Sequence, residues 1–314
     1  MAILVAADFS ADEWAAWWPL LQAALPNERL VRDRHDAAAH DIDVALVANP
    51  PPGSLRDLPN LRFIQSLWAG VDRLLADASV PAQVPLARMV DPAMNEAMAQ
   101  TALWAVLSLH RGFYGYAAQQ RAGVWQAHAH ALKRADEVTV AVLGLGQMGR
   151  TVAQALVRSG YRVLGWNRGV ANAMEGVQVH AGAGTLPHVL AQSQVVINLL
   201  PLTPETRGLF DARTLALMPR GASLVNLARG AHVVEADLLA ALASGHLHHA
   251  VLDVFATEPL PLGAAFWSHP AVTVLPHVAA PTDPRSAALI AARNIQALRA
   301  GQPLQHLVDR TRGY

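Results

Sequence analysis

Short apolar runs alternate with helical patterns along most of the chain. In the first part, the runs at 2–6, 44–48 and 61–66 have the length and composition of buried strands, and the stretch 10–25 has a helical pattern. A long helical segment is expected from about residue 95 to residue 120. A denser series follows, with strands predicted at 138–144, 161–166, 194–200, 222–228, 250–254 and 271–276.

Near-continuous apolar strands that alternate with helices are typical of parallel sheets covered on both faces. The sequence therefore predicts an α/β fold with doubly wound parallel sheets, in two domains joined by the long helix. No strand is predicted after Pro276, and the helical pattern at 283–300 is expected to return to the first domain. The predicted domains are 1–96 plus 283–314, and 97–282.

Composition narrows the possible functions. Hydrophobic residues make up 53% of the chain and charged residues 15%, against about 25% charged in an average soluble domain. Large buried faces are expected, with room for a buried subunit interface. Lysine plus arginine and aspartate plus glutamate both number 24, so there is no basic field to attract nucleic acid. The absence of cysteine excludes disulfides, thiolate zinc sites and cysteine nucleophiles.

The N-terminal residues 1–14 lack the basic region of a signal peptide and become acidic quickly. No apolar run approaches the roughly 20 residues that a membrane span needs. We therefore expect a cytoplasmic protein with a small-molecule partner and no membrane partner.

The most specific motif is a glycine triplet. Gly144, Gly146 and Gly149 form G-x-G-x-x-G directly after a predicted strand, with Gln147 and Met148 at the start of the following helix. Such glycines permit a tight turn and a close approach of the backbone to a pyrophosphate, while the helix N-terminus supplies N–H groups. The segment 97–282 is therefore predicted to bind a dinucleotide.

The end of the next predicted strand bears on the choice of cofactor. NAD sites usually carry an acidic residue here, about 20 residues beyond the glycines. This chain has Asn167, which lacks the charge that repels a 2′-phosphate, and Arg168, which can pair with one. We expect NADP(H) to be preferred, with NAD(H) possible. The alternative is that Arg168 is an ordinary solvated loop residue.

Three residues with complementary chemistry follow strands of the second series: Arg229, Glu258 and His277. With a 2-keto acid as substrate, Arg229 would hold the carboxylate and polarise the keto oxygen, and His277 would donate the proton. Glu258 would accept a hydrogen bond from the other ring nitrogen and favour the charged imidazole. Each residue alone could be structural, but behind a dinucleotide motif the three together favour catalysis.

The segments "LPLTPETRGLFD" (200–211), "LVNLARGAHVVEADLLAAL" (224–242), "LDVFATEPLP" (252–261) and "PHVAA" (276–280) together resemble the D-2-hydroxyacid dehydrogenase family over essentially the whole chain. Within it, "INLLPLTPET", "NLARGAHVVE", "VLPHVAA" and the terminal "LVDRTRGY" are most similar to the glyoxylate/hydroxypyruvate reductase A group. The resemblance implies an NAD(P)H-dependent reductase of glyoxylate or hydroxypyruvate.

The resemblance also implies roles for individual positions. Arg229, Glu258 and His277 match the family's catalytic Arg, Glu and His. Trp68, Ala69 and Gly70 in "SLWAGVD" match a loop of the first, substrate-binding domain whose N–H groups bind the substrate carboxylate. The remaining expected cofactor contacts are Leu200, Pro201, Thr206, Ala228 and Asp253. The family's active site lies in the cleft between two Rossmann-like domains, and its members are usually homodimers.

Several positions depart from the family pattern. Trp68 stands where relatives often have glycine, Ala48 and Asn49 replace a Trp-His pair, and no second basic residue follows Arg168. Gln100 replaces a frequent glutamate. The histidine-rich stretches at 128–130 and 246–249 are interpreted as loop and strand-end residues, and no metal site is predicted.

Two alternatives remain at this stage. One is another 2-hydroxyacid dehydrogenase activity, of the phosphoglycerate, formate or phosphite type; the lack of a further domain after residue 314 speaks against typical large phosphoglycerate dehydrogenases. The other is a dinucleotide-gated binding module similar to the transcriptional corepressors of this family.

Overall fold

The computed structural model describes residues 1–127, 133–170 and 172–313. The chain forms two compact units, Met1–Met94 with Thr282–Tyr314, and Asn95–Pro281. The sequence predicted one boundary after residue 96 and the other after residue 282. In the structure the two boundaries lie two residues and one residue earlier, after Met94 and Pro281. The assignment of substrate and dinucleotide to the two units stays a prediction.

The first unit contains a parallel sheet with the strand order β2-β1-β3-β4-β5 among its described residues. These strands are β1 (Ala2–Ala7), β2 (Arg29–Val31), β3 (Ile42–Ala48), β4 (Phe63–Ser66) and β5 (Leu86–Ala87). The helices are α1 (Ala11–Ala24), α2 (Asp72–Ala76) and α9 (Pro284–Arg299), with a 3-10 turn, η1 (Ala39–Asp41).

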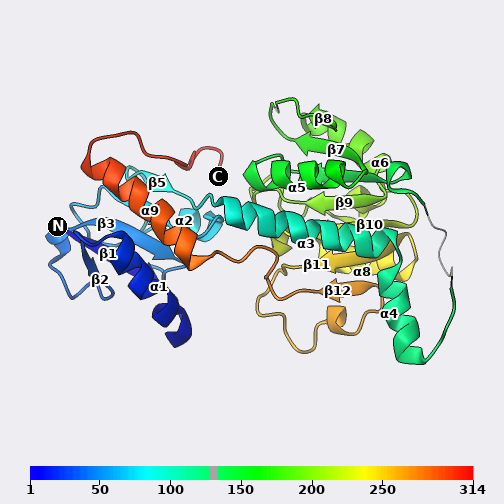
Figure 1. Cartoon of the computed structure of the whole chain (residues 1–314), viewed down its shortest axis with the longest axis horizontal. Helices are drawn as coiled ribbons and strands as arrows, with labels where there is room; N and C mark the ends of the chain where they lie inside the picture. Colours follow the sequence, from blue (N-terminus) through cyan, green and yellow to red (C-terminus); the bar gives the residue numbers. More distant parts are fainter. Residues whose placement is uncertain (128–132, 171, 314) are drawn as a thin grey trace. The chain divides into compact units, whose positions relative to one another are not determined.

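Alternation along the strands divides the core of the first unit. On one face, Leu4, Ile64 and Leu86 join a cluster that includes Leu74 of α2. On the other face, α9 packs against α1 and contacts β4, and the Asn294 amide donates a 2.7 Å hydrogen bond to Gln65. The last helix is therefore part of the unit that the N-terminal strands build (Figure 1).

The second unit contains a larger parallel sheet with the order β12-β11-β10-β9-β6-β7-β8 in its described part. The strands are β6 (Thr139–Leu143), β7 (Arg162–Asn167), β8 (Val177–Ala181), β9 (Val195–Asn198), β10 (Ala222–Asn226), β11 (Leu247–Leu252) and β12 (Val272–Val274). The helices are α3 (Pro92–His110), whose first three residues belong to the first unit, α4 (Phe113–Ala122), α5 (Gln147–Arg158), α6 (Leu186–Ala191), α7 (Ala212–Leu215) and α8 (Glu235–Ala243). Its 3-10 turns are η2 (Ala135–Glu137), η3 (Ala183–Thr185), η4 (Gly230–His232) and η5 (Ala265–Trp267).

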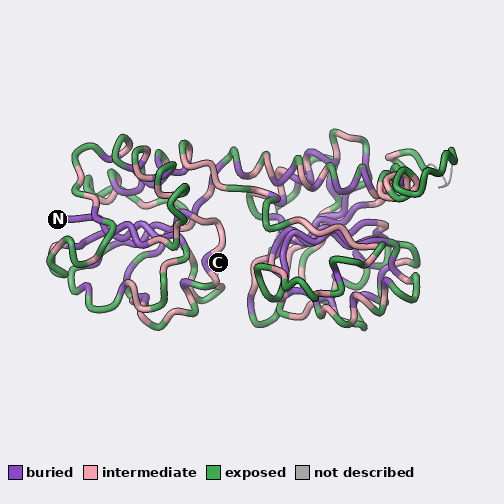
Figure 2. The backbone as a smooth tube through the Cα atoms, turned by 90° about the horizontal axis from the view of Figure 1, so that it is seen from below, coloured by how far each residue is buried: buried purple, intermediate pink, exposed green. Residues whose placement is uncertain are grey.

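Helices cover both faces of this second sheet. Val140 and Val142 of β6 pack with residues of α3 and α5, whereas Ala141 and Leu143 belong to a separate cluster with residues of α6, α7 and α8. The buried positions follow the strands in Figure 2. The predicted α/β, doubly wound class is thus confirmed, because successive residues of one strand point into two different cores.

The strand order also locates the edge at which a ligand binds in such sheets. The chain runs from β6 outward through β7 to β8, then returns to the other side of β6 with β9 and continues to β12. The chain continues from β6 to α5 on one face of the sheet and from β9 to α7 on the other face. The two connections therefore separate at the carboxyl ends of neighbouring strands, which is the usual ligand-binding point of an open α/β sheet.

Some sequence-based elements were wrong. The single helix expected from 95 to 120 is two helices, α3 and α4, because the chain turns at Gly112, which has a left-handed φ of 72°. The short strands β2, β5 and β8 were not predicted, since three residues, two residues and a partly exposed run give little apolar signal. In the described residues, no helix is both long and apolar enough to span a bilayer.

Candidate active site

Sterics require two of the three glycines of the motif. Gly144 has a φ of +99°, and a Cβ there would lie 2.7 Å from the carbonyl oxygen of Leu199. A Cβ on Gly149 would lie only 1.8 Å from the carbonyl oxygen of Gly144. These glycines let the loops after β6 and β9 approach each other and let α5 begin directly against the turn.

Gly146 differs from the other two glycines, because a Cβ at this position would meet no atom within 4 Å. It is the N-cap of α5, with ordinary extended dihedral angles, so the fold itself does not demand glycine here. The first N–H groups of an α-helix have no partner within the helix, and its N-terminus favours an anion. The open space at Gly146, beside the N–H groups at the start of α5, therefore fits the pyrophosphate of a dinucleotide.

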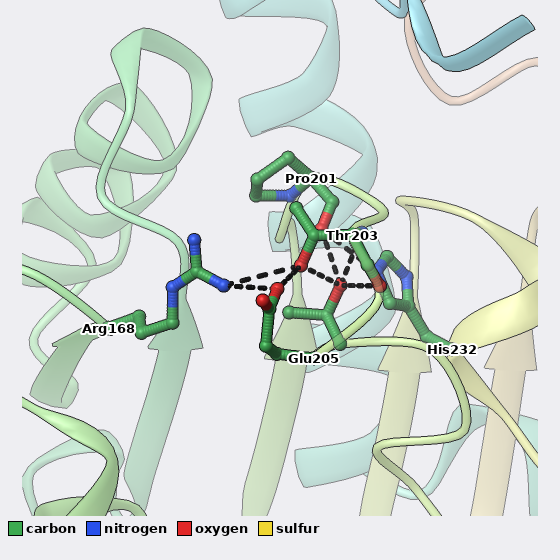
Figure 3. Close-up of polar contacts among 6 residues, drawn as sticks. Arg168, Pro201, Thr203, Glu205 and His232 are labelled. Atoms are coloured by element: carbon green, nitrogen blue, oxygen red, sulfur yellow. Dashed lines mark hydrogen bonds and ion pairs between the residues drawn. The ribbon is translucent and has the colours of Figure 1, made fainter. Parts of the chain in front are cut away.

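The end of β7 shows how the adenosine side of such a site is built. The side-chain oxygen of Asn167 accepts a 2.8 Å hydrogen bond from the N–H of Leu145, so this residue braces the glycine loop. Arg168 is not a free loop cation. Its Nη1 donates to Glu205 at 2.6 Å and to the hydroxyl of Thr203 at 3.4 Å (Figure 3).

The loop after β9 holds Leu200, Pro201 and Thr206, the residues expected to line the cofactor. Leu200 and Thr206 are 5% exposed, and the Thr206 hydroxyl donates to the carbonyl oxygen of Pro201 at 2.8 Å. The same hydroxyl accepts from the N–H of Thr203 at 2.8 Å. The side chain of Thr206 thus fixes the loop from within.

A buried polar network joins the ends of β9 and β10, and the sequence analysis missed it. The Asn198 amide donates to Asn226 at 2.9 Å and lies 3.0 Å from Nδ1 of His232. The Asn226 amide donates to the carbonyl oxygen of Arg229 at 3.0 Å. A signal was available, since both buried strand runs, "VVIN" and "ASLVN", end on an asparagine.

Arg229 directly follows this network. Its Nη1 donates to the carbonyl oxygen of Ala228 at 2.7 Å, and Ala228 is itself 7% exposed. The next residue, Gly230, packs so tightly that a Cβ would lie 1.8 Å from the backbone carbon of Phe255. This close approach places Arg229 beside the segment that follows β11, which contains Glu258.

Glu258 and His277 form a pair at the same edge of the sheet. Nδ1 of His277 lies 2.8 Å from Oε2 of Glu258, and the other carboxylate oxygen accepts from the N–H of Phe255 at 2.9 Å. The hydrogen bond to Glu258 raises the pKa of His277 above its ordinary value, although burial opposes this. At Glu258, burial raises the pKa, but the hydrogen bonds from His277 and Phe255 outweigh this effect, and the pKa is lowered. The positive charge of Arg229 lowers the pKa of both groups.

Asp253 positions the histidine. Its side chain is 2% exposed, and its two carboxylate oxygens accept from the N–H groups of Val278 at 2.7 Å and Ala279 at 3.0 Å. The carbonyl oxygen of Asp253 accepts from the N–H of His277, which has a left-handed φ of 58°. Burial raises the pKa of Asp253. The structure thus gives this residue a backbone-holding role next to His277, in addition to any cofactor contact.

The expected substrate loop lies in the first unit. The hydroxyl of Ser66 accepts from the N–H of Trp68 at 3.1 Å and donates to the carbonyl oxygen of the same residue at 2.9 Å. The Trp68 ring packs edge-on against Trp17 at 5.7 Å, so it belongs to an aromatic cluster with α1. In the described structure, the N–H groups of Ala69 and Gly70 donate no hydrogen bond.

The histidine-rich stretches have no metal-site geometry among the described residues. His246 precedes β11 and the next three residues begin the strand; His249 stacks on Tyr114 at 4.3 Å, and burial lowers its pKa to about 4. The stretch 128–130 lies outside the described residues.

Comparison with known proteins identifies the class of protein. Residues 103–279 match the family model of the D-isomer specific 2-hydroxyacid dehydrogenase, NAD binding domain. The chain belongs to the D-isomer specific 2-hydroxyacid dehydrogenase family, and it is an NAD(P)-dependent oxidoreductase.

The most similar relatives make this placement finer. The chain is 42% identical to the glyoxylate/hydroxypyruvate reductase A of Serratia proteamaculans, over 98% of this chain and 97% of the relative. It is 38% identical to the protein of the same name from Yersinia enterocolitica, again over 98% and 97%. Among solved structures, a 2-hydroxyacid dehydrogenase from Xanthobacter autotrophicus in complex with NADPH and MES is 42% identical, with a TM-score of 0.92 over 100% of this chain and 99% of that one. An NADPH-dependent glyoxylate/hydroxypyruvate reductase from Sinorhizobium meliloti, in complex with NADP and sulfate, is 33% identical, with a TM-score of 0.91 over the same shares.

Proposed function

We propose that the protein reduces glyoxylate and hydroxypyruvate to the corresponding 2-hydroxy acids, with NADPH as the preferred reductant. The observation that carries this proposal is the pair of His277 and Glu258 at 2.8 Å, with Arg229 beside it, at the sheet edge that also carries the glycine loop. The names of the relatives from Serratia and Yersinia support the choice of substrates.

The three residues divide the chemistry of reducing a keto group. When bound, the reduced nicotinamide supplies the hydride that adds to the keto carbon. His277 gives the proton on Nε2 to the keto oxygen, because Nδ1 is engaged with Glu258. Glu258 orients the ring and favours its charged form, because the hydrogen bond to Glu258 raises the pKa of His277. Arg229 holds the substrate carboxylate and polarises the keto oxygen.

The cofactor is proposed to bind along the carboxyl ends of β6, β7 and β9. Gly144, Gly146 and Gly149, with the N–H groups of Gln147 and Met148, receive the pyrophosphate. Arg168 pairs with the 2′-phosphate, and solved relatives with bound NADPH or NADP support this preference. The other proposed cofactor contacts are Asn167, Leu200, Pro201, Thr206, Ala228 and Asp253.

The first unit is proposed to supply the N–H groups of Ala69 and Gly70 to the substrate carboxylate. Their lack of hydrogen bonds in the described structure supports this role. The Trp68 ring packs against Trp17 of α1, which fits the alternative that it serves packing against the neighbouring helix. We propose that this large ring, in place of the glycine frequent in relatives, also narrows the space for a substrate and favours small keto acids. Nothing in the structure explains the effect of Gln100 in place of the family's glutamate.

We also propose that the protein is a cytoplasmic homodimer. Three apolar side chains of α3 and α4 are unusually exposed for a single chain, with Trp104 at 41%, Leu107 at 37% and Phe113 at 50%. The lack of cysteine fits a reducing compartment.

Initial rates test the proposed reaction. Each keto acid is offered with NADPH and with NADH, and consumption of the reduced cofactor is followed. We expect turnover with both acids and a higher kcat/KM with NADPH.

His277→Asn should lower kcat by about 100-fold or more, since a positioned acid contributes that much, while leaving NADP binding intact. Arg229→Gln should damage kcat and KM together.

Other outcomes have distinct meanings. Turnover that favours NADH keeps the reaction and contradicts the cofactor preference. Turnover of 3-phosphoglycerate, formate or phosphite in place of both keto acids assigns another activity to the same site. Full activity of the His277→Asn variant would remove the proton-donor role. Cofactor binding without turnover of any acid would favour the binding-module alternative.

A further inference from the structure

The segment 201–206 after β9 places a carboxylate where the cofactor preference is decided. Glu205 accepts from Nη1 of Arg168 at 2.6 Å and from the hydroxyl of Thr203 at 2.7 Å (Figure 3). The hydrogen bonds from Thr203 and Arg168 lower the pKa of Glu205, so its carboxylate is ionised at neutral pH. The arginine proposed to bind a phosphate therefore already has an anionic partner in this chain.

Hydrogen bonds and burial hold the loop that carries Glu205. Thr203 and Thr206 are 6% and 5% exposed, and the backbone of Thr203 donates to the hydroxyl of Thr206. Nε2 of His232 lies 3.3 Å from the carbonyl oxygen of Pro201 and ties the start of the loop to the turn after β10. The backbone that carries Glu205 is thus held by buried hydrogen bonds, and this places the carboxylate beside Arg168.

The residue at the usual position of the ribose acceptor is uncharged, and its side-chain oxygen already accepts one hydrogen bond. In dinucleotide sites, an acidic residue at the end of the second strand takes the 2′-hydroxyl of NAD, and a nearby arginine takes the 2′-phosphate of NADP. Here the residue at the strand end is Asn167, and its side-chain oxygen already accepts from the N–H of Leu145. The carboxylate beside Arg168 comes instead from Glu205, 37 residues further along the chain.

We infer that Glu205 is a specificity-determining residue: its carboxylate competes with the 2′-phosphate of NADP(H) for Arg168 and accepts a hydrogen bond from the 2′-hydroxyl of NAD(H). This rests on the dinucleotide site of the proposed function. A bound 2′-phosphate takes Arg168 over from Glu205 and lies near a second negative charge. A bound 2′-hydroxyl leaves the ion pair intact. Glu205 therefore lowers the preference for NADP(H) that Arg168 creates.

The size of the effect follows from exposure. The side chains of Arg168 and Glu205 are 36% and 63% exposed, so water and salt weaken their interaction. A change of about twofold to fivefold in relative affinity is the scale expected for an exposed charge of this kind. The preference is therefore tuned by Glu205 and not reversed by it.

The test uses two nucleotides that need no keto acid. Adenosine 2′,5′-bisphosphate and 5′-AMP are titrated calorimetrically into the full-length protein and into Glu205→Gln. We expect the variant to bind the bisphosphate about twofold to fivefold more tightly and to bind 5′-AMP no more tightly than the unaltered protein does. The ratio of kcat/KM for NADPH over NADH should rise in parallel.

Two controls sharpen this test. Asp136→Asn removes a carboxylate from another exposed ion pair, with Arg134, just before β6 begins; it should leave both affinities unchanged. In an Arg168→Gln background, Glu205→Gln should change bisphosphate affinity much less than in the unaltered background. Equal thermal unfolding midpoints would confirm that all variants are folded.

Three results would overturn the inference. Weaker or unchanged bisphosphate binding in Glu205→Gln would mean that the carboxylate positions Arg168 without competing for it. An undiminished effect in the Arg168→Gln background would mean that Glu205 acts only as a distant charge. Binding of neither nucleotide to the unaltered protein would contradict the dinucleotide site itself. Failure of the keto-acid reaction alone would leave these binding results standing.

Discussion

At the scale of single residues, His277 is held by two carboxylates with different tasks. Glu258 bonds to the ring and raises the pKa of the imidazole, whereas Asp253 bonds to the backbone of the two residues that follow. The contact with Glu258 favours the charged form of the ring, and the contacts with Asp253 position the backbone next to the ring. Separate substitutions therefore distinguish protonation from positioning.

The pH dependence of reduction follows from the Glu258 contact. His277 has a raised pKa, so its protonated, proton-donating form predominates below that raised value, and the rate of reduction falls as the pH rises through it. Glu258→Gln removes the charge that favours the imidazolium. The falling limb of the kcat/KM profile should then move to lower pH by about one unit, in addition to a loss of rate.

Glu235→Gln is a matched control for that profile. The Glu235 carboxylate accepts from the N–H of Ala256, in the same segment as Glu258, but it has no hydrogen bond to His277 in the described structure. Its profile should keep the limb of the unaltered protein. An unmoved limb in Glu258→Gln would contradict the assignment of that limb to His277.

At the scale of elements, the first unit depends on one cation that joins three segments. Arg299, at the end of α9, pairs with Glu28 at 2.8 Å and with Asp43 of β3, whose side chain is fully buried. The hydrogen bonds that Arg299 donates to Glu28 and Asp43 raise its pKa still further, so it stays charged. This contact fixes the returning helix to the sheet that the N-terminal strands form.

Arg299→Met should therefore destabilise the protein by about 3–5 kcal/mol, because it leaves the Asp43 carboxylate buried without its cation. Chemical denaturation followed by circular dichroism measures this loss. Arg285→Ala is the control on the same helix: its ion pair with Asp283 is exposed, with the arginine side chain 80% accessible. That variant should lose less than about 1 kcal/mol. Equal losses in both variants would contradict the role of the buried carboxylate.

At the scale of the whole molecule, the exposed apolar side chains of α3 and α4 favour association of two chains. Trp104→Asp should lower the mass measured by sedimentation from twice 33.5 kDa toward 33.5 kDa, since it places a charge in the proposed apolar interface. Leu262→Asp alters a side chain that is 97% exposed in a loop and should leave the dimer intact. A monomeric unaltered protein would refute the proposed homodimer.

Much of this architecture could be predicted from the chain, because it depends on local patterns. Apolar runs such as "VALVA" predicted buried parallel strands, and the glycine spacing predicted the turn between β6 and α5. Short strands with few apolar residues, such as β2 and β5, gave no such signal. The break between α3 and α4 was missed because a glycine inside a helical pattern does not by itself end a helix.

The sequence by itself therefore determined the α/β class, the family, and the residue types at the ends of the strands. Only the tertiary structure decided which of those residues meet: Asn167 with Leu145, Arg168 with Glu205, and Asp253 with the backbone after His277. The physical reason is that strand periodicity is local, whereas partners at a sheet edge are chosen by the order of the strands. That order brings the loops after β7 and β9 to the two sides of β6.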